Sequence, residues 1–150
     1  MPEEVMKMKG HVTIRMIGIN GEEIKRIEQD NLIVNTGKRQ ALHRMGGDAG
    51  YASEHISGIL FGTSATPPNP ADASVATPPW IIRKTVTNTY PAYNQILATA
   101  RLGAAEQNGV SIQELGLAST SYLFSRIVLN ETINKTANFS VMVEWLISIQ

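Results

Sequence analysis

The chain has 150 residues, which is enough for one ordinary domain with its own core and too few for two. Lysine plus arginine and aspartate plus glutamate number 13 each, and this zero net charge removes the electrostatic reason to expect a nucleic acid or anionic membrane partner. The absence of cysteine excludes disulfides, thiolate metal sites and a cysteine nucleophile. No apolar run approaches the roughly 20 residues of a membrane span, and the N-terminus has no secretory signal pattern.

Residues 11–17 alternate between apolar and polar side chains, a pattern typical of a half-buried β-strand. The positions on the apolar side are Val12, Ile14 and Met16. Asn20-Gly21 separates this run from a second one over residues 22–34, and such a pair between two extended runs is a strong hairpin signal. We therefore predict an antiparallel hairpin, preceded by an N-terminal arm over residues 1–10.

One short helix is predicted directly after this hairpin. Asn35 or Thr36 supplies a capping side chain, and Gly46-Gly47 supply the left-handed position that ends the helix. The side predicted to face the core carries Ala41, Leu42 and Met45, and the outer side carries Lys38, Arg39, His43 and Arg44. We expect these basic side chains to be solvated, because no aromatic residues are interleaved with them for nucleic-acid binding.

Residues 55–62 form an apolar run that predicts a buried strand. The segment after it, residues 63–79, contains five of the seven prolines. Proline lacks a backbone N–H and fixes φ, so this segment is predicted to be an extended loop or arm rather than a strand. At about 17 residues it is longer than most loops of compact domains, and such length is typical of a functional or disordered segment.

Five further strands are predicted in the rest of the chain, at residues 80–89, 93–102, 110–117, 122–129 and 139–149. The last is the most regular, because Val143 and Trp145 belong to six apolar residues that face one way. About eight strands with one short helix predict a mainly antiparallel β-sandwich or small barrel, a single domain over residues 11–150. The aromatic residues expected in its core are Phe61, Phe124, Phe139 and Trp145.

The sequence contains no motif for catalysis, cofactor binding or metal binding. A Gly-rich phosphate loop, a Gly-x-Ser-x-Gly elbow, His-Glu-x-x-His and a calcium-binding loop are all missing. Glu54-His55 near Asp48 is the one acid–imidazole cluster, and we interpret it as a polar pair at a strand start, because a metal or acid–base site needs further partners. We therefore predict a protein that is not an enzyme and has no cofactor and no metal.

Aromatic, proline and arginine residues near the predicted loops are the candidates for partner contact. Tyrosine and tryptophan are enriched at the centres of protein interfaces. The charged fraction of 17%, against about 25% in an average domain, fits an interface-rich surface and equally a β-rich protein with Ser and Thr on exposed strand faces. The candidate contact residues are Tyr51, Pro67, Pro68, Pro70, Trp80, Arg83, Tyr90 and Tyr93.

Three segments carry a pattern that matches a known family. The first is Asn-Leu-Ile-Val-Asn-Thr-Gly-Lys at residues 31–38, which leads into the predicted helix. The second is Gly-Ile-Leu-Phe-Gly-Thr-Ser at residues 58–64, which runs into a segment rich in Pro, Ala and Asp. The third comprises residues 112–117, 123–127 and 135–147. In this order, from about residue 11 to residue 149, the chain resembles the small virion proteins of tailed bacteriophages, of the head decoration or tail fibre type.

The resemblance implies a β-sandwich protein that is built into the particle and carries out no chemistry. The function it favours is that of a capsid decoration (cement) protein, a homotrimer that binds the major capsid protein and stabilises the shell. Such a protein is located in the virion and is made in the host cytoplasm. Residues 1–10 and 63–79 are then candidate arms that clamp neighbouring subunits, so deleting residues 1–10 or 64–78 is expected to weaken particle binding and leave the fold intact.

Three other functions remain open at this point. The same sandwich serves as a tail fibre or baseplate adaptor protein, although an aromatic content of 6% disfavours a receptor-binding tip that stacks on sugars. A stand-alone carbohydrate- or ligand-binding module would have a concave aromatic-lined site. A small hydrolase would need a pair of nucleophile and base, which the sequence does not offer.

Overall fold

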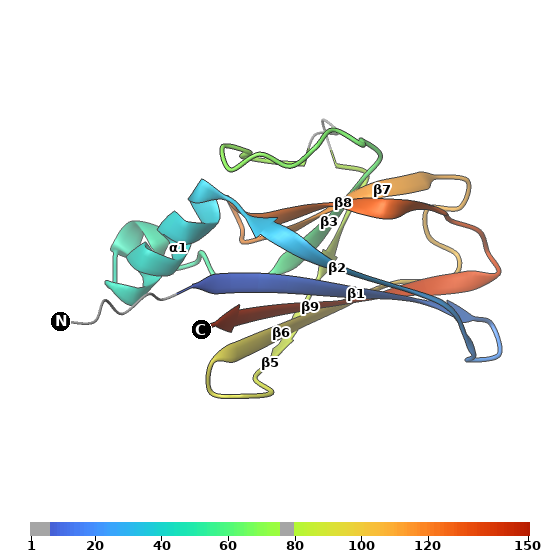
Figure 1. Cartoon of the computed structure of the whole chain (residues 1–150), viewed down its shortest axis with the longest axis horizontal. Coiled ribbons are helices and arrows are strands. Elements are labelled where there is room, and N and C mark those ends of the chain that lie inside the picture. The colour runs from blue at the N-terminus through green and yellow to red at the C-terminus, as the bar shows by residue number, and fades with distance from the viewer. Residues whose placement is uncertain (1–6, 76–79) are drawn as a thin grey trace.

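In the computed structural model, which describes residues 7–75 and 80–150, nine antiparallel strands form one sheet that curls into a nearly closed barrel (Figure 1). Along the sheet the strands follow the order β4-β3-β7-β8-β2-β1-β9-β6-β5. Their bounds are β1 Met8–Gly18, β2 Glu23–Ile33, β3 Gly58–Gly62, β4 Ile82–Thr85, β5 Thr87–Thr89, β6 Gln95–Leu102, β7 Ser111–Ala118, β8 Leu123–Asn134 and β9 Phe139–Ile149. The predicted mainly antiparallel β fold with one short α-helix is confirmed.

The barrel consists of two walls that join at two corners. The first wall is β4-β3-β7-β8 and the second is β2-β1-β9-β6-β5, and the last two residues of β2, Leu32 and Ile33, pair with β8. At the other corner the chain passes from β4 to β5 through Val86, whose N–H donates to Ser57 O at 3.1 Å. The strand predicted over residues 80–89 is therefore two short strands in opposite walls, because the chain changes sheets at a bend.

The N-terminal hairpin forms as predicted and begins earlier than expected. Gly21 takes a φ of +87° in the turn between β1 and β2, a conformation that glycine adopts without steric cost. β1 begins at Met8, which pairs with Ile149 of β9. Residues 8–10 of the expected arm thus belong to the sheet, and residues 1–6 lie outside the described residues.

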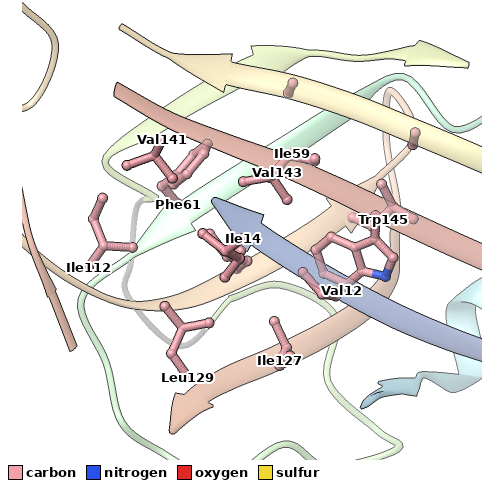
Figure 2. Close-up of a cluster of buried hydrophobic side chains, with 14 of the residues drawn as sticks. Val12, Ile14, Ile59, Phe61, Ile112, Ile127, Leu129, Val141, Val143 and Trp145 are labelled. Atoms are coloured by element: carbon pink, nitrogen blue, oxygen red, sulfur yellow. The ribbon is translucent and has the colours of Figure 1, made fainter. Parts of the chain in front are cut away.

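Side chains from both walls meet in the interior of the barrel (Figure 2). The predicted core positions Val12, Ile14 and Met16 and the four predicted core aromatic residues are all buried, which confirms the strand phases assigned from the sequence. Asn31 supplies the hydrogen-bond partner of the buried Trp145 indole. With its amide nitrogen donating to Gly10 O at 2.7 Å, its oxygen accepts from Ser125 Oγ at 2.9 Å and from Trp145 Nε1 at 3.2 Å. The indole N–H of the buried tryptophan therefore has a partner, as buried polar groups require.

The helix α1 (Asn35–Met45) lies at the end of the barrel, close to the start of β1 and the C-terminus (Figure 1). The prediction that Asn35 or Thr36 caps it is wrong: Val34 occupies the N-cap without a side-chain hydrogen bond, and Thr36 Oγ1 donates to Leu123 O at 2.5 Å instead. The predicted C-terminal end is confirmed, since Gly47 has a φ of +71°.

The prediction that Leu42 and Met45 face the core is also wrong. α1 contacts the barrel through Gly37 and Gln40, both of which are buried. Gly37 lies so close to β8 that a Cβ there would sit 2.1 Å from Phe124 O, and Gln40 Nε2 donates to Leu123 O at 3.1 Å. This close approach turns the apolar side of the helix outward and leaves Leu42 66% and Met45 72% exposed.

Candidate interaction surfaces

Residues 63–75 lie over the outer face of the β3-β7-β8 wall (Figure 1). We call this wall surface the covered face. Val75 forms a small buried cluster there with Leu60 and Ala118. Arg126 of β8 donates hydrogen bonds to the loop. The segment contains no strand, as its prolines predicted, and its described part is docked on its own domain. Residues 76–79 lie outside the described residues.

A buried ion pair fixes this loop to the sheet. Arg126 is 1% and Glu114 0% exposed. Arg126 donates from Nε and Nη2 to Glu114 Oε2 at 3.1 and 2.6 Å, from Nη1 to Asp72 Oδ2 at 3.1 Å, and from Nη2 to Thr66 O at 2.8 Å. Glu114 in turn lies across Gly62, where a Cβ would sit 2.2 Å from Oε1. A guanidinium with this many acceptors tolerates burial, and removing Arg126 would leave the buried Glu114 without this cation.

The sequence contains only a weak signal for this ion pair. Glu114 and Arg126 alternate with the core residues Leu115, Leu117, Ile127 and Leu129, but they share the phase of Ile112 and Phe124, which are also in the core. Charged residues at such positions normally face solvent. Here the loop excludes solvent from them, so only the position of the loop distinguishes a buried ion pair from two solvated side chains.

Three of the predicted contact residues gather around Tyr122. The ring of Tyr51 stacks on that of Tyr122, with ring centroids 5.3 Å apart, and it also contacts the ring of His43 at 4.4 Å. Trp80 and Arg83 line a hollow of about 160 Å³ together with Tyr122, and Arg83 Nη2 donates to Ser57 Oγ at 2.7 Å. The predicted prolines, Pro67, Pro68 and Pro70, lie on the covering loop. Tyr90 and Tyr93 lie elsewhere, in the turn between β5 and β6.

The acid–imidazole cluster considered in the sequence is divided into two parts. Asp48 Oδ2 lies 2.7 Å from Nδ1 of His43, not beside His55. Glu54 is buried and accepts hydrogen bonds from Ser119 Oγ at 2.6 Å and Ser121 N at 3.0 Å. Burial acts to raise the pKa of Glu54, and the hydrogen bonds from Ser119 and Ser121 outweigh it and hold the pKa below its usual value. Among residues 7–75 and 80–150, no three His, Asp or Glu side chains are grouped to hold a metal ion.

A second surface is formed at the end of the barrel that carries α1. Large apolar side chains are exposed there from three different parts of the chain: Leu42, Met45, Tyr90, Tyr93 and Ile149. We call this set the helix end. The turn that carries both tyrosines is tied to the C-terminal end of β9, since Ile149 N donates to Asn94 O at 3.0 Å. These residues are therefore neighbours in space although they are distant in sequence.

A groove of about 510 Å³ runs along the outer side of α1 within the helix end. We call it the helix groove. Its lining is apolar along the floor and basic at the rim, and consists of Lys7, Met8, Lys9, Lys38, Ala41, Leu42, Met45 and Ile149. A second cavity of about 230 Å³ adjoins the groove and shares Met8, Ala41 and Ile149 with it. Its other lining residues are Gln40, Arg44, Glu54, His55, Ile56, Asn88, Tyr90, Ile96, Phe124 and Ile147.

Asn88 has an unusual position in that cavity. Its Nδ2 donates to Ile56 O at 2.8 Å, while its Oδ1 is buried and accepts no hydrogen bond from the part of the chain that the structure describes. A buried carbonyl oxygen without a donor costs about 1–3 kcal/mol. Asn88 therefore places a buried oxygen without a donor beside a lining that also contains Gln40, Arg44, Glu54 and His55.

Comparison of the chain with protein-family models, curated proteins and solved structures gives no match. The relation to bacteriophage virion proteins therefore stays a prediction from the sequence. Within the described residues, no helix is long and apolar enough to cross a membrane.

Proposed function

We propose that this chain is a non-enzymatic structural protein of a bacteriophage virion, and specifically a capsid decoration protein. The observation that carries the proposal is the helix end. Five of the eight exposed large hydrophobic side chains of the described residues lie there. Soluble monomers rarely expose contiguous apolar patches of such composition unless a partner buries them. The major capsid protein is the partner that the sequence resemblance indicates.

In this proposal the rigid barrel presents the helix end to the shell. Tyr93 is fully exposed and Tyr90 is largely so, and tyrosines in such a position provide contact area at a low cost in side-chain entropy. A homotrimer would place three such ends around a symmetry axis of the shell. Three linked contacts bind more tightly than one without any new type of contact.

The test is the amount of this chain in purified particles, measured by quantitative mass spectrometry against the major capsid protein. A ratio near that of the shell subunits supports decoration. A far smaller ratio favours the alternative, a tail fibre or baseplate adaptor protein. Absence from particles overturns both proposals.

The contact surface is tested with a matched pair of variants. Tyr90→Ser with Tyr93→Ser is expected to lower the occupancy of particles at least several-fold, because each tyrosine removed is a large exposed contact side chain. The control is Ile19→Ser with Ile24→Ser, two exposed residues in the β1–β2 hairpin region. Equal occupancy of both variants would show that the helix end is not the contact surface.

The cavity behind α1 favours a second candidate function, a stand-alone ligand-binding module. Its apolar residues, together with the polar side chains of Gln40, Glu54 and Asn88, suit a small and largely apolar ligand with one hydrogen-bonding group. Phenol is a suitable probe for isothermal calorimetry. This candidate predicts measurable binding that Asn88→Ala weakens, and it fails if phenol and its alkyl derivatives give no heat.

A further inference from the structure

The rim of the helix groove carries three lysines that the described residues leave without a carboxylate partner. Lys7, Lys9 and Lys38 are exposed, and no acidic residue lines the groove. Every ion pair within 4.0 Å among the described residues involves other cations, from His11 and Arg15 to Arg126. The groove is thus a locally basic surface on a chain whose net charge is zero.

The floor of the groove is apolar because of the way α1 is docked. Gly37 and Gln40 hold the opposite side of the helix against β8. Leu42 and Met45, three residues apart, therefore project together on the outer side. Met8 and Ile149, which pair across β1 and β9, complete the floor from the sheet.

These two features together restrict the chemistry of a partner. A purely apolar partner would desolvate three ammonium groups without giving them an acceptor, which is costly. A partner that offers only phosphates or carboxylates would pair with the lysines and leave Leu42 and Met45 uncovered. A segment with both apolar and acidic side chains satisfies both parts of the groove.

We propose that the helix groove binds an acidic amphipathic segment of the major capsid protein. Its apolar side chains pack on Leu42 and Met45, and its carboxylates pair with Lys7, Lys9 and Lys38. This inference rests on the proposed function and adds the chemistry of the partner. It also predicts binding that weakens as salt rises, since the rim pairs are close to solvent.

A second copy of this chain is the main rival occupant. The β1–β2 hairpin exposes Ile19 and Ile24 next to Glu22 and Glu23. However, Glu23 already pairs with Arg26 at 3.0 Å and lies 3.9 Å from Arg15. The hairpin therefore brings its own cations with its acids, and the complementarity to a basic rim is weaker.

The first experiment reverses charge on the full-length protein and measures its binding to purified shells that lack it. Lys9→Glu with Lys38→Glu is expected to weaken binding about tenfold or more and to reduce its salt dependence. The matched control, Arg39→Glu with Arg101→Glu, makes the same change in net charge at exposed positions outside the groove. It is expected to change binding less than about threefold.

The outcomes separate this inference from the proposed function. If the wild-type protein binds shells, and the groove variant binds as tightly as the control, the inference is overturned and the decoration function stands. If the wild-type protein does not bind shells at all, the decoration function itself is overturned.

The second experiment identifies the occupant directly. Because the chain has no cysteine, Leu42→Cys provides a single attachment point for a photo-crosslinker in the groove. Cross-linking on decorated particles is expected to capture an acidic, apolar peptide of the major capsid protein. Capture of the β1–β2 hairpin of another copy, or of a capsid peptide without acidic residues, overturns the proposal.

Discussion

A loop of the same chain packs on the covered face, whereas the apolar side chains of the helix end are exposed. At the covered face, residues 63–75 bury Val75 against Leu60 and provide acceptors for Arg126. At the helix end, Leu42 and Met45 stay exposed and the rim lysines have no carboxylate among the described residues. Both surfaces combine apolar side chains with neighbouring cationic side chains. The difference indicates where a partner is needed: at the surface that the chain leaves open.

The docking of residues 63–75 on the covered face changes the expectation for deleting residues 64–78. Such a deletion removes Asp72, Thr66 and Val75 from the covered face, so Arg126 loses two of its acceptors. The expectation that the fold survives unchanged is replaced by one of lower stability. A binding defect in that variant would therefore not identify residues 64–78 as a contact arm.

The largest loss of stability is expected for substitutions in the interior of the barrel. Val143→Asp is expected to abolish cooperative folding, a loss of more than about 4 kcal/mol, because Val143 is fully buried and the new carboxylate would have no partner. Circular dichroism with thermal melting provides the measurement. Ile149→Asp in the same strand is the control, since Ile149 is partly exposed and the melt should persist. A cooperatively melting Val143→Asp protein would mean that the wrong face of β9 has been placed inside.

At the covered face, Arg126→Ala is expected to lower the free energy of unfolding by about 3–5 kcal/mol, because it leaves the fully buried Glu114 without its cation. Chemical denaturation measures the loss. Arg101→Ala, which removes an exposed arginine of β6, should cost less than about 0.5 kcal/mol. A second variant, Arg126→Met with Glu114→Gln, should recover part of the stability, because it removes both charges together. Equal stability of Arg126→Ala and Arg101→Ala would refute the buried ion pair.

A smaller effect is expected where β4 meets the loop after β6. Glu106 accepts from Lys84 Nζ at 2.8 Å and from Gly103 N at 2.8 Å, and these bonds hold its pKa below the usual 4.5. The stabilisation by Glu106 is therefore complete above pH 4.5 and is lost as pH falls through the lowered pKa. Glu106→Gln should melt below the wild type at neutral pH and approach it in acid. A constant difference across pH would contradict this, and Glu22→Gln serves as the control.

The smallest effect on stability is expected at the helix end. Leu42→Ser with Met45→Ser should change the free energy of unfolding by less than about 0.5 kcal/mol, because both side chains already face solvent. The same variant should bind shells more weakly than the wild type. A large loss of stability would show that these side chains are buried within the folded chain, and would remove the basis for the helix groove.

Several features of the fold follow from local sequence. The alternation at Val12, Ile14 and Met16 fixes which side of β1 is inside, since side chains of a strand point to alternate faces. Gly21 and Gly47 mark chain reversals that require left-handed backbone. The prolines of residues 63–75 exclude a strand there. These signals depend only on neighbouring residues, and the structure agrees with each.

Tertiary contacts decided the remaining features. The apolar spacing of α1 predicted Leu42 and Met45 inside, but the close approach of Gly37 to Phe124 rotates the helix and leaves them exposed. Likewise, alternation does not decide the side of Glu114 and Arg126, since each shares its phase with a core residue, and the docked loop makes them a buried pair on the outer face. Periodicity specifies which side of an element is apolar, whereas the covering of each side depends on segments distant in sequence. For this reason the sequence determined the barrel, and only the tertiary structure determined which of its surfaces remains open.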